Sequence, residues 1–271
     1  MKILNQLSAK KIAYCLLVLF IAAGLKYEYS QSTSEDLTWI LGPTASLVEF
    51  LTGEPFIKEK NIGYVSIHQR IAIIPSCSGI NFMVTAFCMS ALALILSTNR
   101  KQHPALCIMA GFAATYGMTV YANSLRIILS IHLYHADIYT PLITPGKIHR
   151  LAGIAVYFIC LCFLYFGIQK IPPCPNRVDA DRQKNKFDNY QSTLISCLVP
   201  LLWYLLIVLV LPALNQAFEK NPSLFQEHAM YVLPVSFFLF VMMFLLVICY
   251  KLVKPKQEPD RIDERANSHR G

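Results

Sequence analysis

Charged residues are scarce in this sequence, and long stretches contain none. Only 15% of the 271 residues are charged, whereas 55% belong to the apolar types. An average soluble domain is about 25% charged and alternates polar with apolar residues, because each of its elements has one face in water. Here the charge-free stretches exceed the length that an ordinary core helix needs. The composition therefore excludes a soluble globule and a disordered chain, and it indicates an integral membrane protein.

The cysteines lack any regular spacing. Their number, nine, is odd and no CxxC pair is present, so the pattern predicts neither a disulfide framework nor a zinc site. We expect no metal and no cofactor. Six of the cysteines lie inside apolar runs, where a thiol behaves as a small buried hydrophobic group. These are Cys15, Cys88, Cys107, Cys160, Cys162 and Cys249.

Basic residues outnumber acidic ones, and the formal net charge is +8. In a soluble protein such an excess would suggest nucleic-acid binding. In a membrane protein it has a topological explanation, because cytoplasmic loops collect Lys and Arg. The lipid bilayer is therefore an expected partner, and nucleic acid is not.

The apolar runs predict an all-α, polytopic transmembrane helix bundle with about six spans. The first run is short enough to resemble a signal peptide, but Lys26-Tyr-Glu-Tyr follows it in place of an A-x-A cleavage site. We interpret it as an uncleaved span. Segments 37–51 and 127–134 could span the membrane, re-enter it or lie at its interface, so the predicted number of spans ranges from six to eight. The six runs are 12–25, 71–99, 104–122, 151–169, 194–214 and 229–250.

A polar, charged stretch containing Pro-Pro-Cys-Pro divides the chain after the fourth run. We predict a catalytic transmembrane core over 1–170. Residues 171–271 would then hold the linker, two further spans and a charged tail, and the sequence assigns no role to them.

The distribution of basic residues orients the predicted spans. With the N-terminus inside, the cytoplasmic segments hold 16 of the 24 Lys and Arg residues, whereas acidic residues divide seven inside and nine outside. This asymmetry follows the positive-inside rule. It places both termini in the cytoplasm. The cytoplasmic segments are 1–11, 99–103, 170–190 and 251–271.

Three polar motifs occur beside spans, where polar groups are costly and so suggest function. In Pro75-Ser-Cys-Ser-Gly-Ile-Asn81, a Cys next to a Gly suits an exposed nucleophile. The alternative is a thiol in a patch of small packing residues. In Asn123-Ser-Leu-Arg-Ile, Arg126 could hold a thiolate or an oxyanion, or it could extend its charged end to the membrane surface.

The third motif is His149-Arg-Leu-Ala-Gly153 at the start of a span. His149 could act as a general acid or base near neutral pH, or it could be an interfacial aromatic residue. His132 and His135 are rivals, because a helix over 127–134 would place them near Arg126. Under the predicted topology Cys77, Arg126 and His149 all lie at the outer face, so bundling of their spans could assemble a site for acyl transfer on a peptide.

These three motifs, in this order, resemble those of the exosortase/archaeosortase family. The family pattern is a Cys followed by Ser or Ala and Gly, an Arg in an N-x-x-R context, and a His four residues before a Gly. The resemblance covers about 65–170, and within the family it points to the exosortase K branch. It implies a membrane cysteine protease or transpeptidase with Cys77, Arg126 and His149 as catalytic residues.

By that resemblance, the substrates are exported proteins with a C-terminal sorting signal made of a short motif, an apolar helix and a basic tail. Cleavage would occur at the outer, periplasmic face of the cytoplasmic membrane, with transfer to an acceptor in the cell envelope. We expect support for the site from Ser78, Gly79, Asn81 and Asn123. Two other classes remain open: a transporter with 123–146 lining its site, and a non-catalytic subunit of an envelope polysaccharide assembly system.

Overall fold

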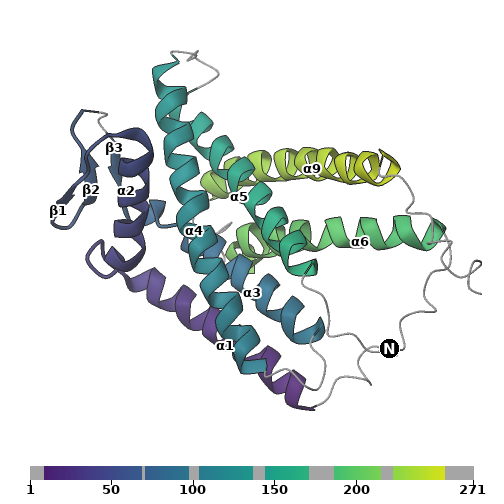
Figure 1. The fold of residues 1–271 in the computed structure, drawn as a ribbon. Coiled ribbons are helices and arrows are strands. Elements are labelled where there is room, and N and C mark those ends of the chain that lie inside the picture. The colour runs from purple at the N-terminus through teal and green to yellow at the C-terminus, as the bar shows by residue number, and fades with distance from the viewer. Residues whose placement is uncertain are drawn as a thin grey trace, which may run out of the picture.

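The computed structural model describes residues 9–68, 71–97, 104–136, 144–170, 186–214 and 222–253, and it is a helix bundle with one small sheet (Figure 1). The predicted all-α, polytopic class is confirmed. The helices of the described part are α1 (Ala9–Gln31), α2 (Thr38–Thr52), the 3₁₀ turn η2 (Pro75–Cys77), α3 (Ile80–Ser97), α4 (Pro104–His135), α5 (Pro145–Gln169), α6 (Lys186–Leu205), the π-helical turn η4 (Leu206–Val210), α7 (Leu211–Leu214) and α9 (Pro222–Val253).

Five helical segments of the described part are long and apolar enough to cross a membrane. They correspond to the second through sixth predicted spans. The predicted first span forms the continuous 23-residue helix α1, which is not among the five. Its role as a span stays a prediction. The five segments are Pro75–Leu96, Ala105–His135, Pro145–Gln169, Thr193–Ala213 and Phe225–Tyr250.

Three predicted boundaries were wrong. The second run is not helical from its start, because Ile71–Ile73 form a strand and α3 begins only at Ile80. The third run does not end near Ala122, since α4 continues unbroken to His135. The fourth helix begins six residues before Leu151, where Thr144 caps it and Pro145 occupies its first turn. Hydropathy finds the apolar centre of a helix and misses polar ends of this kind.

A three-stranded antiparallel sheet, which the sequence analysis did not anticipate, lies beside α2. Its strands are β1 (Ile57–Glu59), β2 (Gly63–Ser66) and β3 (Ile71–Ile73), in the order β1-β2-β3. Lys58 on β1 contacts Glu35 at 2.7 Å and donates to Thr38 Oγ1 at 3.1 Å. The hydrogen bond from Lys58 lowers the pKa of the Glu35 carboxyl. These contacts hold the sheet to the start of α2.

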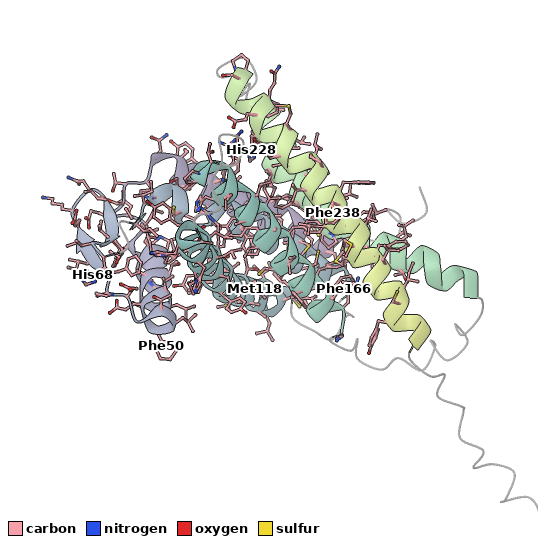
Figure 2. The ribbon with its side chains drawn as sticks, turned by 90° about the horizontal axis from the view of Figure 1, so that it is seen from above. Phe50, His68, Met118, Phe166, His228 and Phe238 are labelled. Atoms are coloured by element: carbon pink, nitrogen blue, oxygen red, sulfur yellow. The ribbon has the colours of Figure 1, made fainter. Side chains whose placement is uncertain are left out.

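Two apolar clusters meet at α3, most of which is buried. One cluster joins α3 to α1, α2 and α4 through residues such as Leu41 and Phe87. The other joins α3 to α5, α6 and α9, as in the edge-to-face pair Phe158–Tyr204. Figure 2 shows His68 of the sheet region at one end of the molecule and Phe238 of α9 toward the other. The last two long helices therefore belong to the same packed body as the predicted core.

Candidate active site

Cys77 is the last residue of a short 3₁₀ turn between β3 and α3. Its backbone N–H donates to the Ile74 carbonyl at 2.7 Å, and Pro75 opens the turn with a preset φ angle. Gly79 then adopts a φ of +72°, which favours glycine. A Cβ on Gly79 would lie 3.3 Å from Tyr157 Oη, so a side chain there would crowd Tyr157. The Ser-Gly step after Cys77 thus lets the thiol approach α4 and α5.

Arg126 lies at the centre of the site. From α4 its Nη1 donates to Tyr157 Oη at 2.7 Å, and its Nη2 lies 3.8 Å from Cys77 Sγ and 2.8 Å from His149 Nε2. Asn123, one turn earlier on α4, donates to the backbone carbonyl of Cys77 and accepts from Tyr157 Oη at 3.0 Å. The planar guanidinium fork therefore contacts all three partners at once, which a Lys could not do.

The hydrogen bonds around His149 define its protonation state. Arg126 can only donate, so His149 Nε2 accepts and carries no proton. Ser130 donates to the Arg126 backbone carbonyl at 2.8 Å, so its Oγ, 2.7 Å from His149 Nδ1, accepts from that nitrogen. These partners assign the neutral tautomer with the proton on Nδ1. The imidazole thus presents an unprotonated Nε2 next to the guanidinium.

Gly153 makes room for the arginine. A Cβ at this position would lie 3.2 Å from Arg126 Cδ and 3.5 Å from Nε. The helical spacing of His149, Gly153 and Tyr157, at i, i+4 and i+8 on α5, puts all three on the face that meets Arg126. Tyr157 also places its ring under the guanidinium, 5.4 Å from Cζ to the ring centroid.

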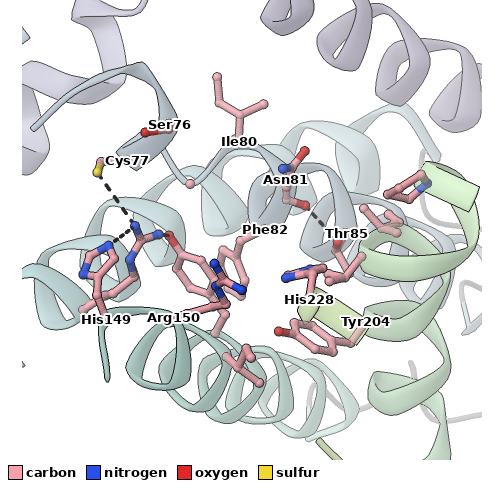
Figure 3. Close-up of a pocket in the computed structure, with 18 of the residues that line it drawn as sticks. Ser76, Cys77, Ile80, Asn81, Phe82, Thr85, His149, Arg150, Tyr204 and His228 are labelled. Atoms are coloured by element: carbon pink, nitrogen blue, oxygen red, sulfur yellow. Dashed lines mark hydrogen bonds between the residues drawn. The ribbon is translucent and has the colours of Figure 1, made fainter. Parts of the chain in front are cut away.

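A cavity of about 850 Å³ opens beside these residues (Figure 3). Figure 3 shows Cys77 and His149 on one side of it and Tyr204 and His228 on the other. The far wall comes from the end of α6 and from η4, α7 and α9, so the last two long helices and the turns between them complete the cavity. The residues that these helices contribute are Tyr204, Ile207, Val208, Pro212, Phe225 and His228.

Cations line the cavity as well. Lys26 donates to Asn81 Oδ1 at 2.5 Å. Arg150 lies 3.3 Å from Glu227 and over the ring of Tyr231. Glu227 offsets the charge of Arg150, so Lys26 and Arg126 bring positive charge to the site, which would favour an oxyanion formed there.

The other predicted residues divide into two groups. Asn123 donates to the Cys77 backbone carbonyl, Gly79 lies beside Asn123 and Tyr157, and Asn81 lines the cavity and accepts from Lys26. Ser78 is fully buried, and its Oγ has no hydrogen-bond partner in the described part of the chain. The rivals His132 and His135 each bond their own helix, to the carbonyls four residues earlier, and they do not line this cavity. The structure brings His149, and neither rival, to Arg126.

Neither Ser130 nor Tyr157 was predicted from the sequence. Ser130 lies four residues after Arg126, and Tyr157 lies eight residues after His149. Continuing the helical period from each singled-out residue would have placed both on the same faces. The helical spacing thus indicated both residues, but the predicted end of the third span near Ala122 left Ser130 beyond that span.

A family model for the transmembrane exosortase matches residues 5–166, which is more than half of the chain. The chain belongs to the transmembrane exosortase family. No curated protein and no solved structure matches it. The family match does not single out the K branch, which stays a prediction. The exosortase match ends within α5, so the helices that form the far wall of the cavity lie beyond it.

Proposed function

We propose that this exosortase is a cysteine transpeptidase of the cytoplasmic membrane. Its substrates would be exported proteins that end in a short motif, an apolar helix and a basic tail. The observation that carries the proposal is the position of Arg126 Nη2, within hydrogen-bonding reach of both Cys77 Sγ and His149 Nε2 at the edge of a large cavity. A nucleophile, a base and an oxyanion donor are the parts that acyl transfer needs.

The chemistry follows from these three groups. As Arg126 turns its N–H from His149 Nε2 to the scissile carbonyl oxygen, the freed Nε2 takes the proton of the Cys77 thiol. The thiolate then attacks the carbonyl carbon, and Arg126 stabilises the charge on the carbonyl oxygen. The C–N bond then breaks, and His149 protonates the leaving amine. A thioester remains on Cys77. An incoming nucleophile loses its proton to His149 and displaces the thiolate, which gives transfer when the nucleophile is an envelope acceptor and hydrolysis when it is water.

The proposal is tested by replacing the nucleophile. Cys77→Ala should leave a co-encoded exported protein with such a C-terminus uncut in the membrane, whereas Cys249→Ala, on the exposed side of α9, should process it normally. Cys77→Ser should also fail, since an alkoxide is far harder to form than a thiolate. Trapped acyl-enzyme should be released by hydroxylamine and identified by mass spectrometry. Normal processing by Cys77→Ser would instead favour a non-catalytic assembly subunit or a transporter.

The same proposal requires the site to face outward. An impermeant thiol reagent added to cells without an outer-membrane barrier should label Cys77, and a reporter fused near Lys58 should indicate the outer side. A cytoplasmic signal from that reporter would place the sheet and the site on the wrong side and would contradict the proposal.

A further inference from the structure

Cys77 and His149 line a second cavity of about 240 Å³ in addition to the large one. Strand β3 forms one wall of this small cavity. The ends of α4 and α5 form the others, through apolar side chains such as Ile127 and Ile148. Its volume is below the roughly 300 Å³ at which small-molecule pockets begin. It suits one or two residues of extended chain.

The wall made by β3 is an open sheet edge. Strand order β1-β2-β3 leaves β3 paired on one side only within the described part of the chain. The Ile73 carbonyl faces β2, since a Cβ on Gly63 of β2 would lie 2.3 Å from its oxygen. Successive residues of a strand direct their backbone groups to opposite edges. The N–H and C=O of Ala72 therefore point to the open edge, and Ala72 is exposed and lines the small cavity.

The open edge leads directly to the thiol. Only Ile74, Pro75 and Ser76 separate β3 from Cys77. An extended peptide can join such an edge as an extra strand, with backbone hydrogen bonds supplying affinity and side-chain pockets supplying selectivity. A peptide paired with Ala72 would lie along the small cavity that Cys77 also lines.

We propose that the acyl side of the substrate binds as an added strand on β3, hydrogen-bonded to Ala72, with an apolar side chain in the small cavity. This inference rests on the proposed function and specifies how its site holds the peptide. In the small cavity the β3 wall lies outside the five candidate membrane spans and the other walls belong to the ends of two of them, whereas the far wall of the large cavity lies wholly within such spans. The exported part of the substrate thus occupies the small cavity, and the leaving apolar helix occupies the large one.

The test uses the full-length protein in detergent and two peptide reagents. Acetyl-alanyl-valyl chloromethyl ketone alkylates a thiolate, which displaces chloride and forms a thioether. Its analogue with both amides N-methylated cannot donate backbone hydrogen bonds. We expect the first reagent to alkylate wild-type Cys77 about tenfold faster than the second, the effect of one or two hydrogen bonds. Equal rates of Cys77 alkylation by the two reagents in the wild-type protein would overturn the proposal.

Ala72→Pro removes the outward N–H and leaves the pairing with β2 intact, because that N–H does not face β2. It should slow alkylation by the first reagent about tenfold, because a carbonyl of the bound peptide loses its donor, and Ala72→Val, which keeps the N–H, should react at the wild-type rate. Chloroacetamide, which has no peptide backbone, should alkylate Cys77 equally in all three proteins. An unchanged rate of alkylation by the first reagent in Ala72→Pro would overturn the added-strand proposal. Failure of the proposed function is distinct, since it would appear as normal substrate processing after complete alkylation of Cys77.

Discussion

Ser130 Oγ lies 2.7 Å from Nδ1 of His149, so a hydroxyl on α4 orients an imidazole on α5. The hydroxyl hydrogen is engaged by the Arg126 carbonyl, which leaves the oxygen to accept from Nδ1. An orienting group of this kind keeps the other ring nitrogen, Nε2, unprotonated and directed at the reacting centre. Ser130 is thus a positioning residue, because it acts through His149.

Replacing the Ser130 hydroxyl should slow the chemical step. Ser130→Val should lower kcat about tenfold, as expected for one lost hydrogen bond, with KM unchanged. Ser130→Thr, nearly the same shape as Val, keeps the hydroxyl and should restore kcat. Processing rates measured over a range of substrate concentrations separate the two constants. A purely structural role for Ser130 would predict equal activity for Thr and Val.

Gly153→Ala should damage the site without damaging the fold. The new Cβ would lie 3.2 Å from Arg126 Cδ and would displace a side chain held at both ends of its guanidinium. Alanine is the better helix former by about 1 kcal/mol, so thermal stability should not fall. We expect at least a tenfold loss of processing, measured beside membrane protein level. Gly167→Ala on the same helix, where nothing lies within 4 Å, is the matched control and should stay active. Full activity of Gly153→Ala would show that Arg126 tolerates displacement.

Much of the bundle could be predicted from the sequence, because the apolar centre of each predicted span is a run without charge. The sheet over 57–73 could not be predicted, since its strands have only three or four residues and their polar/apolar alternation is too short to indicate a strand. The Cys77, Arg126 and His149 candidates came from their motifs and the family resemblance, and the structure places them together. What brings them together is tertiary: a left-handed Gly79, a missing side chain at Gly153 and the packing of α4 on α5.

The far wall of the cavity was also beyond sequence reasoning. Tyr204 lies in an apolar run and His228 directly before the next one, neither belongs to a motif, and residues 171–271 had no assigned role. Their part in the cavity follows from the packing of α6 and α9 against α5, which only the fold shows.

Arg126→Lys should abolish processing while the protein still reaches the membrane at its normal level. Lysine keeps the charge but has one nitrogen, and the fork of Arg126 contacts Tyr157 with one nitrogen and His149 with the other. A blot of the membrane fraction beside the processing assay distinguishes loss of function from loss of protein. Near-normal processing would mean that a point charge suffices and that the fork geometry is dispensable.

A bulky side chain on the far wall of the cavity should block substrate binding and leave the alkylation rate of Cys77 unchanged. Val208 lies on η4 and lines the large cavity, whereas Val210, two residues later, is exposed and does not line it. A Trp at 208 would project into the space proposed for the leaving apolar helix. We therefore expect Val208→Trp to lose most processing and Val210→Trp to retain it, at equal membrane levels. Chloroacetamide reaches Cys77 through the small cavity as well, so its alkylation rate should match wild type in both variants. Normal processing by Val208→Trp would show that the substrate does not use the space between α5 and η4, and that the last two long helices serve packing alone.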